Sequence, residues 1–273
     1  MIHLAELPFR IENLGGFPFT QEEETYLRTI GTPTAVSPLP EFRMDIVPEA
    51  IFQFPDVPKR GTPARIVWFE DRVRVVHDDF QAEVLPFERR GSLFRRHRCT
   101  YAFMAALRTA LTAVLPLDGG FALHGAAVSD GARGWAFFGP SGAGKTTLAS
   151  TSPFDVISDE EVVVRGMPFV LGANGFWGAL AAMDAPRGMV AMGAVAELDK
   201  SARFSLSRLE RGDAVKALVR SLRVYPVRGL WEATLLNIQN LVESIPVFRM
   251  GWSPEAPVWE PFVRALEDAG AGR

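Results

Sequence analysis

Residues 64–85 alternate between apolar and polar side chains in three short runs, 64–69, 72–76 and 81–85. Acidic pairs separate these runs, at Glu70–Asp71 and Asp78–Asp79. A period of two is typical of half-buried strands and short polar breaks are typical of turns, so this region predicts a β-meander. Prolines are spread through residues 1–60, where they exclude a long helix. We therefore expect an antiparallel, β-rich unit at the N-terminus.

The pattern changes to helical spacing at Tyr101–Val114, where apolar residues recur every three or four positions and Pro116 ends the run. Two apolar runs follow, Phe121–Val128 and Trp135–Phe138, with turn residues 129–134 between them. These runs predict a strand hairpin, in which the second strand is antiparallel to the first.

Strand and helix patterns mix in the rest of the chain. Pro153 leaves room for only a short helix after Lys145, and Asp155–Ser158 has the composition of a strand. Further strands are predicted at 161–165, 169–171, 195–198 and 247–250, and helices at 213–224, 230–243 and 255–269. Because a hairpin supplies an antiparallel neighbour and helices intervene later, we expect the sheet to be mixed.

The composition is that of an ordinary globular protein. With 273 residues, 48% of them hydrophobic, the chain can form one large domain or two small ones. Its 29 basic and 32 acidic residues give a net charge of −3, so no basic excess indicates nucleic acid or a membrane surface as a partner. The single cysteine, Cys99, excludes an internal disulfide and fits a reducing compartment. Neither a membrane-spanning stretch nor a signal peptide is recognisable, so we expect a cytoplasmic protein.

The densest basic run lies at residues 87–98, where arginines outnumber all other polar residues. We expect a solvated connector there, and the alternative is a docking surface for an acidic substrate or phosphate. The sequence leaves the role of residues 89–98 open. The run marks the predicted boundary between a β-rich N-terminal unit, residues 1–98, and a second domain, residues 99–273.

The predicted hairpin leads into a segment that matches the phosphate-binding loop pattern G-x-x-x-x-G-K-[ST] in full. Its residues are Gly139, Pro140, Ser141, Gly142, Ala143, Gly144, Lys145, Thr146 and Thr147. Glycines let the N–H groups of such a loop converge on phosphates, and the following helix adds partial positive charge. Lys145 is expected to contact the β- and γ-phosphates, and the Thr146 hydroxyl to ligate Mg²⁺. The segment therefore predicts a nucleotide site.

The acidic partner of a phosphate loop distinguishes transport ATPases from kinases. Transport ATPases carry that partner far downstream, after an L-S-G-G-type signature that this chain lacks. Here Asp159 and Glu160 follow the predicted strand 155–158, closely after Lys145. If that strand lies beside the loop strand, one carboxylate can accept the proton of an attacking hydroxyl while the other binds Mg²⁺. The alternative is a solvated acidic turn.

Three motifs occur in a fixed order: Leu123-His124-Gly125, the loop at 139–147, and Ser158-Asp159-Glu160. In this order and spacing the chain resembles the HPr kinase/phosphorylase family, and in particular the HPr kinase-related proteins of bacterial gene clusters. The likeness covers about residues 100–260. It implies an α/β fold in which a mixed β-sheet carries the P-loop kinase core, as in HPr kinase and phosphoenolpyruvate carboxykinase, next to a smaller β-rich N-terminal unit.

The resemblance also implies roles for single residues. Asp159 matches the general base for the acceptor hydroxyl, and Glu160 matches a second aspartate, which we expect to bind the metal. His124 matches a histidine near the base, although a lone strand histidine is by itself most often a packed core residue. Lys145 and Thr146 match the phosphate and metal residues. The family's downstream glycine- and isoleucine-rich signature has no counterpart, and Ala173–Trp177 fill roughly that region.

The leading hypothesis is an ATP-dependent, Mg²⁺-requiring kinase that transfers the γ-phosphate to a hydroxyl, with Ser or Thr of a peptide or small protein as the expected acceptor. The N-terminal unit would be its substrate or partner module. One alternative is a small-molecule kinase, which predicts a closed, polar pocket over Asp159. The other is a non-catalytic ATP-binding regulatory protein, suggested by glutamate at position 160. The identity of the acceptor, the reverse reaction and assembly into a homo-oligomer are left open.

Overall fold

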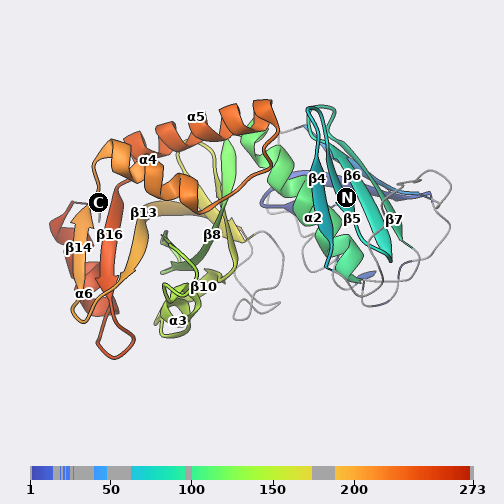
Figure 1. Cartoon of the computed structure of the whole chain (residues 1–273). Helices are drawn as coiled ribbons and strands as arrows, with labels where there is room; N and C mark the ends of the chain where they lie inside the picture. Colours follow the sequence, from blue (N-terminus) through green and yellow to red (C-terminus); the bar gives the residue numbers. More distant parts are fainter. Residues whose placement is uncertain are drawn as a thin grey trace. The chain divides into compact units, whose positions relative to one another are not determined.

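The structure is a computed structural model that describes residues 2–14, 19, 21, 23–24, 27, 40–47, 63–95, 100–173 and 188–270 (Figure 1). The chain forms two compact units. The first consists of Met1–Asp118 and Val224–Glu232, and the second of Gly119–Arg223 and Ala233–Arg273. Among the helices of the described residues, none combines the length and the apolar character needed to span a lipid bilayer.

The described residues of the first unit form a seven-stranded sheet in the order β1-β2-β3-β7-β6-β5-β4. Its strands are β1 (Ile2–Leu4), β2 (Leu7–Asn13), β3 (Phe42–Ile46), β4 (Arg65–Trp68), β5 (Val73–Val76), β6 (Phe80–Leu85) and β7 (Arg90–Arg95). The predicted meander is confirmed, because β4 to β7 pair in sequence order and antiparallel. The expectation of a wholly antiparallel unit is wrong, since β3 runs parallel to both β2 and β7. The connection from β2 to β3 is long enough for the crossover that parallel pairing requires.

The helix predicted at Tyr101–Val114 is confirmed as α2 (Thr100–Val114), followed by the 3₁₀ turn η2 (Leu115–Asp118). Its contacts are with β5, β6 and β7 of the first sheet. The first unit therefore extends to Asp118, beyond the boundary expected at residue 98. The physical reason is that the apolar face of α2, including the buried Phe103 and Leu107, packs on this sheet.

The arginine-rich run is not a solvated connector where the structure describes it. Residues 90–95 form β7, and the buried guanidinium of Arg95 pairs with Glu23 and lies 4.7 Å above the ring of Phe103. Arg89 pairs with Asp118. These arginines contribute to the packing of the first unit, while residues 96–98 lie outside the described part of the chain.

The second unit is built on a mixed sheet, in which the described residues form nine strands. They are β8 (Gly120–Ser129), β9 (Arg133–Phe138), β10 (Asp155–Ser158), β11 (Glu161–Arg165), β12 (Val170–Ala173), β13 (Met189–Lys200), β14 (Ser205–Arg208), β15 (Leu222–Arg223) and β16 (Val247–Trp252). The predicted hairpin is confirmed as β8–β9. Strand β13 pairs in parallel with both β9 and β16, and the other pairings among the described residues are antiparallel. The expected mixed sheet is present.

Helices cover both faces of this second sheet (Figure 1). They are α3 (Lys145–Ser150), α4 (Arg211–Arg220), α5 (Arg228–Ser244) and α6 (Trp259–Asp268). Residues of α4 and α5 share one apolar cluster with the sheet, while residues of α3 and α6 share the other. The helices predicted at 213–224, 230–243 and 255–269 are confirmed as α4, α5 and α6, each with different end residues. Helix α3 is short, as Pro153 predicts. The predicted strand 195–198 is longer than expected, because its glycine- and methionine-rich start also pairs, with β9 and β12.

One expectation about the sheet is wrong. Strand β10 does not lie beside the loop strand β9; it pairs with residues 127–129 of β8, while β11 pairs with residues 120–124. The neighbours of β9 are β8 and, in parallel, β13. The hairpin takes one edge of the loop strand and β13 takes the other, so β10 is excluded from both.

Candidate functional site

The phosphate-loop residues connect β9 to α3 in the second unit. Gly139, Gly142 and Gly144 have φ values of 149°, 79° and 91°, which residues with a Cβ atom rarely adopt. A Cβ on Gly144 would lie 2.4 Å from Cζ2 of Trp252, whose Nε1 donates a hydrogen bond of 3.1 Å to the Ala143 carbonyl. Trp252 at the end of β16 therefore supports the loop, and sequence reasoning did not identify it.

Lys145 is folded back onto the loop. Its Nζ donates hydrogen bonds to the carbonyl oxygens of Gly139, at 2.9 Å, and Pro140, at 3.1 Å. Burial lowers the pKa of Lys145 below its usual value, the carboxylate of Glu160 opposes this shift, and the charge of Arg223 adds to it. The side chains of Thr146 and Thr147, in the first turn of α3, are exposed. The ammonium of Lys145 thus interacts electrostatically with Glu160, the acidic residue predicted to act with it.

Asp159 and Glu160 occupy the break between β10 and β11. Across this break the amide of Gly125 on β8 donates a hydrogen bond of 3.2 Å to the Glu160 carbonyl. On its other side, Gly125 pairs with Phe138, the last residue before the phosphate loop. One strand, β8, therefore separates the backbone of Glu160 from the backbone of Phe138. This separation corresponds to two strand spacings, or about 10 Å. The carboxylates are near the loop even though β10 and β9 are not neighbours.

The two carboxylates differ in exposure. Asp159 is only 4% exposed and takes part in interactions within the folded chain, whereas the side chain of Glu160 is 45% exposed. Little of Asp159 is therefore accessible from solvent. Glu160 is the carboxylate that solvent and ligands meet first.

His124 joins this group from the middle of β8. Its Nδ1 lies 3.1 Å from the Glu160 carbonyl oxygen and 4.0 Å from Oε1 of the same residue. Burial lowers the pKa of His124, and the positive charges of Arg223 and Lys145 lower it further. The imidazole is therefore neutral near pH 7, where its two nitrogens offer one donor and one acceptor. His124 is a partly buried polar residue of the cluster, not a packed core histidine.

Arg223 is the member of the cluster that sequence reasoning missed. Its Nη2 lies 3.1 Å from Nδ1 of His124 and 3.7 Å from Oε1 of Glu160. Because a guanidinium only donates, the contact with His124 requires the imidazole proton to be on Nε2. The pattern had been assigned to a helix at 213–224, but α4 ends at Arg220 and β15 then pairs with β8. Pro226 restricts only the preceding Tyr225 and is compatible with a helix that ends at Val224, so no local signal marked residues 222–223 as a strand.

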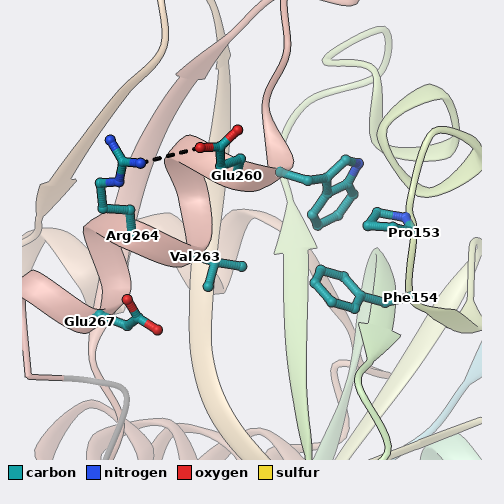
Figure 2. Close-up of a pocket in the computed structure, with 7 residues that line it drawn as sticks. Pro153, Phe154, Glu260, Val263, Arg264 and Glu267 are labelled. Atoms are coloured by element: carbon teal, nitrogen blue, oxygen red, sulfur yellow. Dashed lines mark hydrogen bonds and ion pairs between the residues drawn. The ribbon is translucent and has the colours of Figure 1, made fainter.

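A separate open groove lies between α6 and the segment after α3, with a volume of about 450 Å³ (Figure 2). Phe154, Trp259 and Val263 form its apolar part, and Glu260, Arg264 and Glu267 its charged rim. Arg264 and Glu260 are hydrogen-bonded at 3.2 Å. The groove contains none of the predicted site residues. It lies at the C-terminal end of α3, whereas the phosphate loop lies at the N-terminal end.

The second unit thus brings together four charged or titratable residues beside the phosphate loop: His124, Lys145, Glu160 and Arg223. The buried Asp159 directly precedes Glu160 in the sequence. Of the segment expected to replace the downstream family signature, residues 174–177 lie outside the described part of the chain. A scan against protein-family models finds no match, and a search of the curated proteins finds none either. The family resemblance stays a prediction from the motifs.

Proposed function

We propose that this protein is an ATP-dependent kinase that transfers the γ-phosphate to a hydroxyl, with serine or threonine of a peptide or small protein as the acceptor. The observation that carries the proposal is the arrangement around Gly125, which pairs with the start of the phosphate loop on one side and with the Asp159–Glu160 break on the other. A phosphate cradle and carboxylates at this separation are the two parts that phosphoryl transfer needs.

The residues present fit a nucleotide with Mg²⁺. The loop glycines have the left-handed backbone angles that let amides turn toward phosphate oxygens, and Lys145 supplies a cation within the loop. Since α3 has only six residues, the loop amides and Lys145 would contribute more to phosphate binding than the helix dipole. The exposed Thr146 hydroxyl and Glu160 would hold the metal. When bound, ATP with Mg²⁺ would supply the transferable phosphoryl group.

The protein's own residues divide the remaining work. Asp159 would accept the proton of the acceptor hydroxyl, once the residues that cover this carboxylate have moved. Arg223 and Lys145 would balance the negative charge of the phosphates, as cations do at phosphoryl-transfer sites. Neutral His124, whose Nδ1 accepts a hydrogen bond from Arg223, would orient this guanidinium without adding charge.

A non-catalytic ATP-binding protein is the second candidate. The observation that favours it is the burial of Asp159, because a base that stays covered cannot take a proton from an acceptor. The two candidates make opposite predictions for phosphoryl transfer and the same prediction for nucleotide binding.

The test combines a binding assay with a transfer assay. Wild-type protein is titrated with ATP and Mg²⁺ and is incubated with γ-labelled ATP and a serine/threonine peptide library. Lys145→Ala should weaken nucleotide binding at least about tenfold, since it removes the loop's cation. Asp159→Asn should abolish transfer but retain binding. Asp155→Asn, the same change at an exposed position of β10, is the matched control and should leave both unchanged.

Each result separates the candidates. Labelled peptide with wild type and none with Asp159→Asn supports the kinase. Full transfer by Asp159→Asn refutes the assignment of the base. Tight ATP binding with no label on any peptide refutes a peptide acceptor and leaves the regulatory protein and the small-molecule kinase. A wild-type protein that does not bind ATP refutes every one of these candidates.

A further inference from the structure

The carboxyl end of β13 lies beside the phosphate loop. Strand β13 is the parallel neighbour of the loop strand β9, with Glu197 in register with Phe138, the last residue of β9. At this point β9 gives way to the loop, whereas β13 continues to Lys200. A Cβ on Gly139, the first residue of the loop, would lie 3.1 Å from the Leu198 carbonyl oxygen. The last residues of β13 therefore flank the loop on the side opposite β8.

The alternation of side chains along β13 places Lys200 on the same face of the sheet as the loop. Successive side chains of a strand point to opposite faces, so Ala196, Leu198 and Lys200 share one face. Leu198 belongs to the apolar cluster that also contains Ala143 of the loop and Trp252 of β16. Lys200 is in register with Trp252, whose indole supports the loop. Lys200 is thus the first position beyond this cluster, at the carboxyl end of the strand.

The ammonium of Lys200 is available to a ligand. Its side chain is exposed, and it makes no ion pair or side-chain hydrogen bond within the part of the chain that the structure describes. The exposed Lys216 of α4, by contrast, pairs with Asp213. Asp199 precedes Lys200 but projects from the opposite face of the sheet. A compact ammonium on a flexible stem binds phosphate as a point charge, so Lys200 is suited to an anion held by the loop.

The residues proposed to act in phosphoryl transfer lie on the other side of β9. His124 is on β8 and Glu160 lies next to it, and β8 pairs with the edge of β9 that faces away from β13. The γ-phosphate has to lie on this side, because phosphoryl transfer needs the carboxylates near it. The rest of a triphosphate can then extend across the loop toward β13. This direction agrees with the general position of ligands outside the carboxyl ends of parallel strands, here β9, β13 and β16.

We propose that Lys200 binds the α-phosphate of ATP, so that the nucleotide lies across the loop with its γ-phosphate on the β8 side and its nucleoside on the β13 side. This inference rests on the proposed nucleotide site and adds the direction in which the donor is bound. Lys145 would contact the β- and γ-phosphates, and Lys200 supplies a second lysine for the phosphate that remains. The two lysines then hold the triphosphate from opposite sides of the loop strand.

Titration of the full chain with ATP and Mg²⁺ tests the role of Lys200. Lys200→Met removes the charge, keeps most of the stem and should raise the Kd for ATP about five- to tenfold, because a charge-assisted contact is lost. Lys200→Arg keeps the charge and should stay within about twofold of wild type. Lys216→Met is the matched control, the same change at another exposed lysine of the second unit, and should bind ATP like wild type. Melting curves should be unchanged for all three variants, since both lysines are exposed.

Phosphorus NMR of ATP at saturating protein identifies the phosphate that Lys200 contacts. Between wild type and Lys200→Met, the resonance of the bound α-phosphorus should shift more than that of the γ-phosphorus. A larger shift at the γ-phosphorus, or none at the α-phosphorus, overturns the proposed direction. An unchanged Kd for Lys200→Met, or an equal loss of affinity in Lys216→Met, overturns the role of Lys200 and leaves the proposed nucleotide site intact. A wild type that does not bind ATP refutes the proposed function itself.

Discussion

Two glycines of the phosphate loop provide a controlled test of the role of Trp252. Gly142 and Gly144 both have left-handed backbone angles, with φ of 79° and 91°. A Cβ on Gly142 would meet no heavy atom of the described residues within 4 Å, whereas one on Gly144 would lie 2.4 Å from Cζ2 of Trp252. Alanine at either position incurs left-handed backbone strain, so the difference between the two variants reports mainly on the contact with Trp252.

The expected magnitudes follow from these two contributions. Left-handed backbone costs a residue with a Cβ about 1–2 kcal/mol, which is the whole effect expected for Gly142→Ala. Overpacking adds about 1–3 kcal/mol for Gly144→Ala, because the indole is buried and cannot simply rotate into solvent. Gly144→Ala should therefore destabilise the second unit by about 2–5 kcal/mol in total.

Differential scanning calorimetry of the full chain measures this effect and can resolve the two units if they unfold separately. For a unit of this size, 1 kcal/mol corresponds to a shift in Tm of about 2–4 °C, so the two variants should differ by about 2 °C or more. Adding Trp252→Phe to Gly144→Ala should recover part of the loss, because phenylalanine lacks the crowded part of the indole. The contact between residue 144 and Trp252 does not constrain the loop if Gly142→Ala lowers the Tm as much as Gly144→Ala does. The same conclusion follows if Trp252→Phe destabilises the Gly144→Ala variant as much as it destabilises the wild type.

Three other predictions concern charged or titratable residues. Arg223→Ala should raise the pKa of His124 toward its usual value in an NMR titration, because it removes a positive charge; an unchanged or lower pKa contradicts the cluster geometry. The pKa of His124 is lower in the folded state than in the unfolded state, so folding stability should fall as the pH drops from about 6.5 through the folded-state pKa. Urea unfolding at pH 7.5 and pH 5.5 measures this fall in stability, and His124→Gln should reduce it. In the first unit, Glu23→Gln should destabilise by about 3–5 kcal/mol in urea unfolding, because it removes the carboxylate charge that pairs with the buried guanidinium of Arg95. A loss below about 1 kcal/mol would show that this ion pair does not stabilise the unit.

Local pattern was sufficient for the elements that depend only on neighbouring residues. The meander at β4–β6, the helix α2, the hairpin β8–β9 and the short α3 all agree with the structure. Turn residues and proline act within a few positions, and a sequence records them directly. The phosphate-loop glycines belong to the same class, because their left-handed angles are a local requirement.

Long-range pairing could not be predicted in this way. The sequence could only consider the case in which β10 lies beside β9, and β10 pairs with β8 instead. Strand β3 is parallel to its neighbours in a unit expected to be antiparallel. The same limit explains why Arg223 was missed. It reaches His124 only because β15 pairs with β8, a contact between residues 99 positions apart.

The sequence by itself determined that residues 139–147 match the phosphate-loop pattern and that two carboxylates, Asp159 and Glu160, follow it closely, because both observations depend only on residue type and short spacing. The tertiary structure decided which groups share the site. It inserted β8 between the loop strand and the carboxylates, brought His124 and Arg223 together with Glu160, and buried Asp159. Burial and charge proximity arise from packing of distant segments, so no local pattern could have specified them.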